Sequence, residues 1–239
     1  SEQFKPTEES KPAEPSKPIE QPTPGMPERL PTNTGLAFSI KTENEGGIVG
    51  NVNTIKNEQE LIATNNFTSI DVDGKNIPID FKLEPSQDWT KEGAFIEKLN
   101  LAPHICCGKY TDVRFGAIAS HSFGQDDILF YNGNPSNSMP ESGEVTYKGE
   151  SIMADKGNHV FGGYRKGTSE FKVNFGDKKL SGSLNVDSPK YDVESGESKF
   201  NNVKVDINAD ISGNKFYGTA KSSSFVSEAV SEGKFYGDG

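Results

Sequence analysis

The sequence predicts an all-β protein in which a proline-rich tail precedes two β-rich domains. Aromatic residues and glycines are numerous, with 15 Phe, 7 Tyr and 25 Gly among 239 residues, which suits short strands joined by tight turns. Several segments alternate between apolar and polar side chains, as half-buried strands do. No apolar run reaches the roughly 18 residues that a membrane-spanning helix needs.

Residues 1–34 form the predicted disordered tail. Eight of the 14 prolines fall by Pro31, spaced among Glu, Lys, Ser and Thr. Such a segment has too little apolar surface to offset the entropy of ordering. A proline-rich spacer can hold a domain away from an anchor, but we favour the simpler interpretation of a disordered terminus without a binding role.

Residues 35–138 form the predicted N-terminal domain. Asp73–Gly74 lies between alternating residues and predicts a two-residue hairpin turn. Thr90–Asn100 predicts a short helix or an irregular segment, and the polar loop Asn132–Pro140 carries the domain boundary. The predicted strands are Leu36–Ile40, Gly47–Ile55, the two arms of Phe67–Phe81, Tyr110–Ser120 and Asp127–Tyr131.

Residues 139–239 form the predicted C-terminal domain, an up-and-down antiparallel barrel. Phe200–Ile211 places Val203, Val205, Ile207 and Ala209 on one face and polar residues on the other. Phe225–Val230 predicts a short helical or irregular connection. The other predicted strands are Gly143–Ala154, Phe171–Phe175, Leu180–Val186, Lys215–Ala220 and Gly233–Gly237.

A series of motifs follows Met139 in this domain. It comprises Met139-Pro140-x-Ser142-Gly143-x-x-x-Tyr147-x-Gly149, Phe171-x-Val173-x-Phe175, Leu180-Ser181-Gly182-x-Leu184, Phe216-x-Gly218-x-Ala220 and Gly233-x-Phe235-Tyr236-Gly237. Together, over about 100 residues, these motifs resemble the barrel of the transferrin-binding protein B superfamily. The resemblance implies an N-terminal clamp or handle domain followed by an eight-stranded barrel. The chain stops before the segment that closes that barrel in the family, so we expect its last strands to be missing.

The resemblance also implies function and location. The family comprises surface-exposed or secreted proteins of Gram-negative bacteria, anchored in the outer leaflet of the outer membrane or released. A single lobe is most similar to the haemophilin-type haemophores. This implies capture of haem, with haemoglobin as a further partner, for a TonB-dependent outer-membrane receptor after export by a Slam-type translocon. Ser1 in place of a lipidated cysteine is consistent with secretion, and the proline-rich tail is equally similar to the spacer behind a lipid anchor.

Two other hypotheses remain open. The chain is either a surface lipoprotein that binds a host protein (transferrin, haemoglobin or a complement regulator) without a cofactor, or its barrel serves only as an export platform. Catalysis is not expected, because the sequence has no Gly-x-Ser-x-Gly, phosphate loop or His-Glu-x-x-His. A net charge of −10 without a basic face argues against nucleic-acid binding.

The segment His104–Phe130 carries the candidate haem site. Haem needs an apolar slot and one or two axial ligands, usually His and less often Tyr. Because of the resemblance we predict His104 and His121 as iron ligands and Tyr110 as a further candidate. Phe115 and Phe123 would line the slot, and Lys109, Arg114 and Arg165 are candidates for pairing with the propionates.

Cys106 and Cys107 are the only cysteines and are neighbours. A disulfide between neighbours is possible, and two reduced thiols, one of them buried as a small apolar side chain, are an alternative. In a strand the two side chains would point to opposite faces, so one metal ion could not easily take both. We therefore expect a structural role for the pair.

Overall fold

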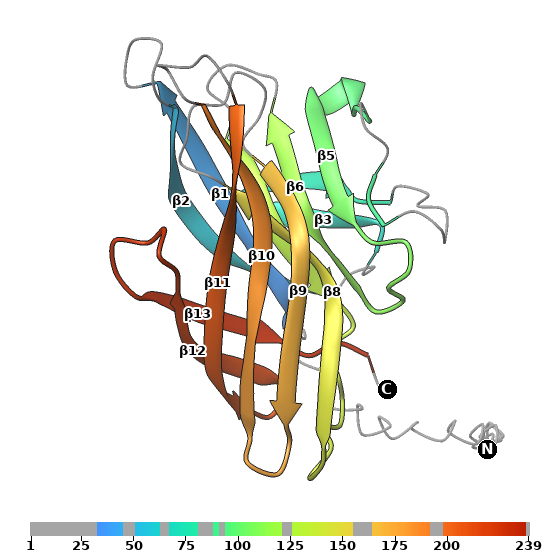
Figure 1. Ribbon diagram of the computed structural model, residues 1–239. Coiled ribbons are helices and arrows are strands. Elements are labelled where there is room, and N and C mark those ends of the chain that lie inside the picture. The colour runs from blue at the N-terminus through green and yellow to red at the C-terminus, as the bar shows by residue number, and fades with distance from the viewer. Residues whose placement is uncertain are drawn as a thin grey trace, which may run out of the picture. The chain divides into compact units, whose positions relative to one another are not determined.

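The computed structural model describes residues 33–44, 51–62, 67–80, 88–90, 94–120, 126–154, 164–191 and 198–237 (Figure 1). The chain divides into two units, Ser1–Leu30 and Pro31–Gly239. The predicted tail lies outside the described residues. Those residues form strands, tight turns and one short 3₁₀ helix, which confirms the predicted all-β class.

The first sheet contains five antiparallel strands in the order β2-β1-β7-β6-β5. Next to it, the short strands β3 and β4 form a separate hairpin, and the 3₁₀ helix η1 (Glu97–Leu99) lies in the segment predicted as a short helix or irregular. The bounds are β1 Asn33–Asn44, β2 Asn51–Ile62, β3 Ser69–Val72, β4 Lys75–Pro78, β5 Leu101–Cys106, β6 Val113–Ser120 and β7 Asp127–Gly133.

The β3–β4 hairpin turns where the sequence predicts. Asp73 and Gly74 both have positive φ, 50° and 74°, as a two-residue type I′ turn requires. Ile70, Val72 and Ile77 of the hairpin are buried with apolar residues of β1, β2, β5, β6 and β7. The hairpin therefore covers one face of the first sheet, which we call the outer face.

The strand registers define the opposite, inner face of the same sheet. Leu101 and Ile105 of β5 belong to the outer-face core, so His104 and Cys106 point to the inner face. Phe115 is the register partner of both Cys106 and Tyr131, and it therefore shares the inner face with them. The inner face contacts the second sheet.

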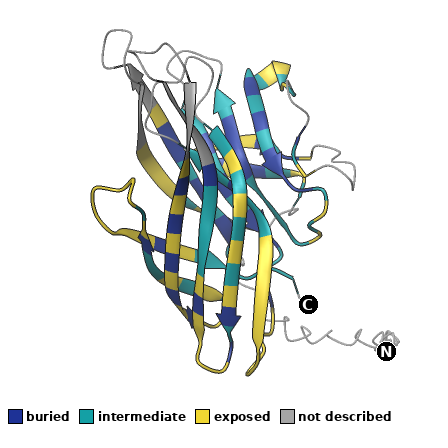
Figure 2. Cartoon of the chain, in the orientation of Figure 1, coloured by how far each residue is buried: buried dark blue, intermediate teal, exposed yellow. Residues whose placement is uncertain are grey.

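The second sheet contains six antiparallel strands in the sequential order β13 to β8. The predicted alternation in Phe200–Ile211 is confirmed, since Val203, Val205, Ile207 and Ala209 are buried between exposed residues (Figure 2). The described residues thus supply six of the eight predicted barrel strands. The bounds are β8 Glu144–Ala154, β9 Tyr164–Asn174, β10 Lys179–Tyr191, β11 Ser198–Ser212, β12 Lys215–Lys221 and β13 Ala229–Lys234.

The predicted strand bounds were wrong in several places. β2 runs on to Ile62, past the predicted end at Ile55, and β9 begins at Tyr164, before the predicted start at Phe171. The last strand begins at Ala229, inside the predicted irregular connection, because the β12–β13 register pairs Ala220 with Ala229. The strand predicted from Tyr110 begins only at Val113. Tyr110 instead lies in a turn that contacts β8, so a tertiary contact overrides local alternation there.

The end of the described chain pairs with the loop between the sheets. Pro135 and Tyr236 form an isolated bridge, and Ser136 N donates to Phe235 O at 3.0 Å. Tyr236 Oη donates to Thr34 O of β1 at 2.8 Å. These contacts connect the second sheet to the first strand, although the residues are about 200 positions apart in sequence.

Candidate functional site

His104 lies on the inner face, next to the second sheet. Its ring centroid is 6.0 Å from that of Tyr164 on β9. Tyr164 Oη in turn donates to Asp127 Oδ2 at 2.7 Å, and Ser120 N donates to Asp127 Oδ1 at 2.7 Å. Burial, and then the negative charge of Asp127, raise the pKa of Tyr164 well above its usual range. His104 therefore faces a packed, hydrogen-bonded contact between the two sheets.

Phe115 also belongs to this contact. Its ring meets Trp89 edge to face at a centroid distance of 5.8 Å, and Lys166 Nζ of β9 lies 5.0 Å from the centre of the Trp89 ring. Trp89 itself bridges to Cys106. Edge-to-face rings and a cation over indole are both favourable packing arrangements, so Phe115 serves to join the sheets.

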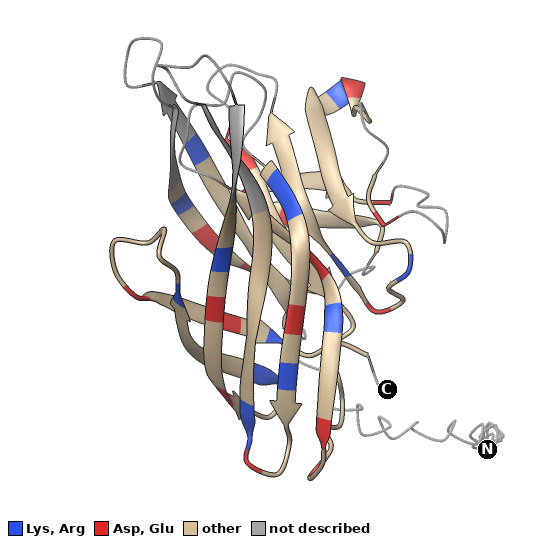
Figure 3. Ribbon diagram, viewed as in Figure 1, with Lys and Arg blue, Asp and Glu red and all other residues tan. Residues whose placement is uncertain are grey.

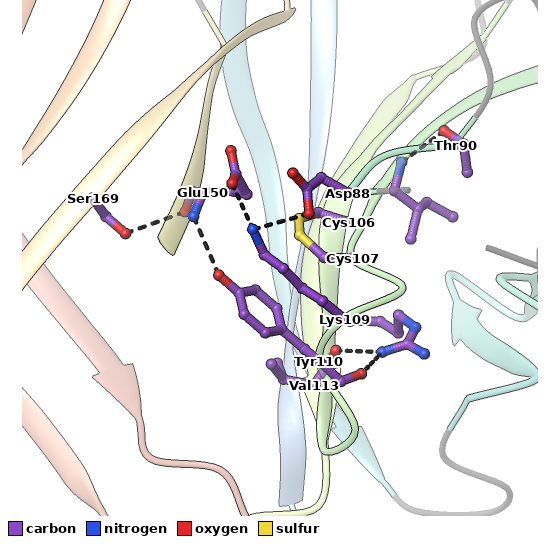
Figure 4. Close-up of a disulfide and its surroundings, with 11 residues drawn as sticks. Asp88, Thr90, Cys106, Cys107, Lys109, Tyr110, Val113, Glu150 and Ser169 are labelled. Atoms are coloured by element: carbon purple, nitrogen blue, oxygen red, sulfur yellow. Dashed lines mark hydrogen bonds and ion pairs between the residues drawn. A yellow bond between two sulfur atoms is a disulfide. The ribbon is translucent and has the colours of Figure 1, made fainter. Parts of the chain in front are cut away.

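Tyr110 lies in the turn after β5 and contacts the barrel strand β8 (Figure 4). Its hydroxyl accepts a hydrogen bond from Glu150 N at 3.3 Å. Gly149 leaves room for that hydroxyl, because a Cβ there would lie 2.5 Å from Tyr110 Oη. Arg114 donates to the carbonyl oxygens of Tyr110 and Val113, which fixes the start of the turn.

Lys109 connects the same turn to two carboxylates (Figure 4). Its Nζ lies 2.8 Å from Glu150 Oε1 and 2.9 Å from Asp88 Oδ1. Hydrogen bonds to Glu150, and then to Asp88, raise the pKa of Lys109. The Lys109 side chain is 38% exposed, so these ion pairs contribute little stability on their own. They orient the turn against β8.

Cys106 and Cys107 are joined by a disulfide and are fully buried (Figure 4). Of the alternatives left open by the sequence, the structure has the disulfide between neighbours. Within the described part of the chain, no group of three His, Cys, Asp or Glu side chains is arranged to hold a metal ion. The pair shapes the turn that carries Lys109 and Tyr110.

A groove of about 700 Å³ lies on the outer face of the first sheet, beside the β3–β4 hairpin. Its floor is apolar and its rim is polar or charged. Its lining includes Val72, Ile77, Leu99, Leu101 and Ile128 as well as Ser39, Lys56, Asn57, Asp73, Lys75 and Asp126. Open hollows with an apolar floor and a few fixed polar groups are typical of binding sites.

Asp73 is the most firmly held polar group of this groove. Its carboxylate accepts hydrogen bonds from Ser39 Oγ and Asn57 Nδ2, both at 2.8 Å, and its N–H donates to Gln59 Oε1 at 3.0 Å. Lys56 and Asp126 form an ion pair of 2.9 Å across the rim. Sequence reasoning predicted Asp73 only as a turn residue, and no local signal indicates that the turn lies over β1 and β2.

The described residues do not form the predicted haem slot. His104 and Phe115 share the inner face, whereas the large groove opens on the outer face and has no His, Tyr, Met or Cys in its lining. Tyr110 is held by β8, and His121 and Phe123 lie outside the described residues. Haem ligation by His104 and His121 therefore stays a prediction.

Comparison with known proteins identifies relatives. A family model described as the C-lobe and N-lobe beta barrels of Tf-binding protein B matches residues 139–239. An uncharacterized protein of Haemophilus influenzae is 35% identical over 214 residues, covering 86% of this chain and 67% of that protein. Transferrin-binding protein B of Haemophilus influenzae is 27% identical and is matched over 71% of this chain and 34% of its own length.

A solved structure shares the fold. A crystal structure of a mutant transferrin-binding protein B from Haemophilus parasuis Hp5 has a TM-score of 0.54 at 23% identity, covering 85% of this chain and 39% of that chain. The two sheets define a β-rich lobe with a handle sheet and a barrel sheet. The chain belongs to the transferrin-binding protein B-like superfamily. It spans about a third of the length of the Haemophilus influenzae transferrin-binding protein B and about two fifths of the solved one. The described residues contain no helix that could cross a membrane.

Proposed function

We propose that this chain is a protein-binding lobe that takes hold of a host iron-carrying protein, transferrin first, outside a Gram-negative cell. The observation that carries the proposal is the groove on the outer face, with its apolar floor and its fixed carboxylate at Asp73. Two relatives named for transferrin binding support the choice of partner. On this proposal the lobe binds without catalysis and serves iron acquisition together with an outer-membrane receptor.

The groove suits a loop of a folded partner. Ile77 and Leu101 belong to the buried core beneath the groove and are only 2% and 1% exposed, so the surface open to a partner is mostly polar. Lys56, Lys75, Asp73 and Asp126 surround the groove with both signs of charge. Charged groups at the edge of a protein–protein interface set specificity and association rate.

The test is binding of the immobilised protein to purified mammalian transferrins, with haemoglobin and hemin as parallel probes. We expect saturable binding of a transferrin that Asp73→Asn weakens at least about fivefold, because rim charges steer association. Asp210→Asn is the matched control, since Asp210 is an exposed aspartate paired with Lys179 in the second sheet. It should bind as the unaltered protein does.

Two results would overturn the proposal. One is the absence of binding to any transferrin or to haemoglobin. The other is a Soret band on addition of hemin that disappears in His104→Ala, which would establish a haem carrier instead. Equal affinity of Asp73→Asn and Asp210→Asn would move the binding surface away from the groove.

A further inference from the structure

The exposed side of strands β12 and β13 carries large apolar side chains. Tyr217 is 62% exposed and Val230 is 64% exposed, and Phe225 and Val226 are exposed in the loop between the strands. The register pairs Thr219 with Val230 and Tyr217 with Glu232, so Tyr217 and Val230 are diagonal neighbours on one face. Phe216 and Ala220 alternate with them and pack into the core. The exposed side chains Tyr217 and Val230 are therefore not needed for packing of the core.

A groove of about 260 Å³ adjoins Tyr217 and reaches the first sheet. Glu58, Glu60 and Glu232 line it together with Lys215 and Lys234. Figure 3 shows that acidic and basic residues both occur on β12 and β13. Lys234 Nζ donates to Asn33 O and Asn33 Oδ1 at 2.7 and 2.8 Å, so its ammonium is engaged inside the groove. Burial, and then the charges of Glu232 and Glu58, raise the pKa of Tyr131 to about 12. The groove thus places carboxylates next to the aromatic rings of Tyr131, Phe216 and Tyr217.

We propose that Tyr217, Phe225, Val226, Val230 and Glu232, which we call the β12–β13 patch, bind a segment of a protein partner in which lysine or arginine alternates with apolar residues. Apolar side chains of that segment would cover Val226 and Val230. Its cations would meet Glu232 and the Tyr217 ring, which attracts cations through its π face. This goes beyond the proposed function, because it assigns a second surface on the other sheet.

Charge complementarity decides in favour of a basic segment. The chain has a net charge of −10, which attracts basic partners over long range and repels acidic ones. The adjoining groove is lined by three carboxylates and two ammonium groups, one of which Asn33 already holds, and beside the patch Lys221 and Glu228 pair with each other. Tyrosine is among the residue types that are enriched at the energetic centres of protein interfaces.

The experiment uses the full chain and two dye-labelled peptides, one of alternating lysine and valine and one of alternating glutamate and valine, measured by fluorescence anisotropy. We expect the lysine peptide to bind with a dissociation constant on the order of 10–100 μM and the glutamate peptide not to bind. Affinity for the lysine peptide should fall at least fivefold in the double variant Tyr217→Thr/Val230→Thr. Threonine keeps the β-propensity of both strands.

The matched control is Val145→Thr/Tyr147→Thr on β8, at the other edge of the second sheet, where both residues are more than 40% exposed. It should leave the affinity unchanged. Equal loss in both double variants, or equal binding of the two peptides, would overturn the proposal. Glu232→Gln, which keeps shape and strand, should weaken lysine-peptide binding and its salt dependence even if the double variant fails to fold. Transferrin capture is measured separately, so the two proposals fail independently.

Discussion

The two faces of the first sheet differ in how they are covered. The inner face meets the second sheet through aromatic rings, the Tyr164–Asp127 hydrogen bond and the Lys109 ion pairs. Among the described residues, the outer face is covered by the short β3–β4 hairpin together with Ile96 and Leu99, and a groove of about 700 Å³ lies beside the hairpin. One face joins the two sheets, and the other carries the open groove.

This difference between the two faces bears on the segment His104–Phe130, which the sequence predicted as the candidate haem site. The groove is open on the outer face, whereas His104 is partly buried and its ring lies 6.0 Å from that of Tyr164 on β9, a contact that a ligand of His104 would disturb. Opening a packed contact costs free energy that the ligand must supply. The open face is therefore the better place to look for binding, and the following predictions test that contrast.

Replacement of the buried Ile105 should have the largest effect. Ile105→Ala removes a fully buried side chain of the outer-face core and should destabilise the fold by about 2–5 kcal/mol. His104→Ala, one residue earlier on the inner face, should cost less than about 1.5 kcal/mol because its side chain is only partly buried. Urea unfolding followed by circular dichroism compares them. A larger loss in His104→Ala would mean that the inner face carries the stability.

Much of the fold could be predicted from local patterns. The Asp73–Gly74 turn is fixed by two residues that tolerate positive φ, and the long strand β11 by strict alternation. The start of β6 and the position of β13 could not be predicted. Tyr110 is drawn out of the strand by its contact with β8, and the register of β12 decides where β13 begins.

The candidate site could be predicted only in part. The sequence singled out His104, Tyr110 and Phe115 because of their side-chain chemistry, and the structure places all three at the contact between the sheets. The sequence did not indicate that Asp73 lies at the groove, because Ser39 and Asn57, the hydrogen-bond partners of Asp73, lie 34 and 16 positions away in the chain. Contacts over such distances in sequence follow from topology, which local periodicity does not report.

A pH above 10 should lower the free energy of unfolding, because a buried tyrosine on the inner face then ionises, and the effect should be smaller than that of Ile105→Ala. Burial raises the pKa of Tyr131 to about 12, from an ordinary value near 10. Its neutral form therefore stabilises the fold below pH 10, and this contribution is lost as pH rises from about 10 to about 12, by at most about 1.4 kcal/mol per pH unit before solvent screening. Burial also raises the pKa of Tyr164 and Tyr236.

Thermal unfolding between pH 8 and pH 11.5 measures this effect. Tyr131→Phe should show a shallower fall of Tm above pH 10 than the unaltered protein, because it lacks one late-ionising phenol. Absorbance at 295 nm should show the corresponding loss of a late titration step in the folded variant. Identical slopes in the two proteins would mean that Tyr131 ionises equally in the folded and unfolded chains.

Gly149 and Tyr110 provide the smallest and most specific test of the inner face. A methyl group at Gly149 would lie 2.5 Å from Tyr110 Oη but 3.6 Å from its Cζ, which is an ordinary contact. Gly149→Ala should therefore cost about 1 kcal/mol by displacing the hydroxyl, and Tyr110→Phe a similar amount by removing the hydrogen bond to Glu150 N. In the double variant the phenyl ring accommodates the methyl group, so its cost should be less than the sum of the two.

Fluorescence of Trp89, the only tryptophan of the sequence, reports on the contact, because its ring packs on Phe115 beneath Lys166. Additive costs, or an unchanged Trp89 spectrum in all three variants, would show that the turn after the disulfide does not hold the two sheets together.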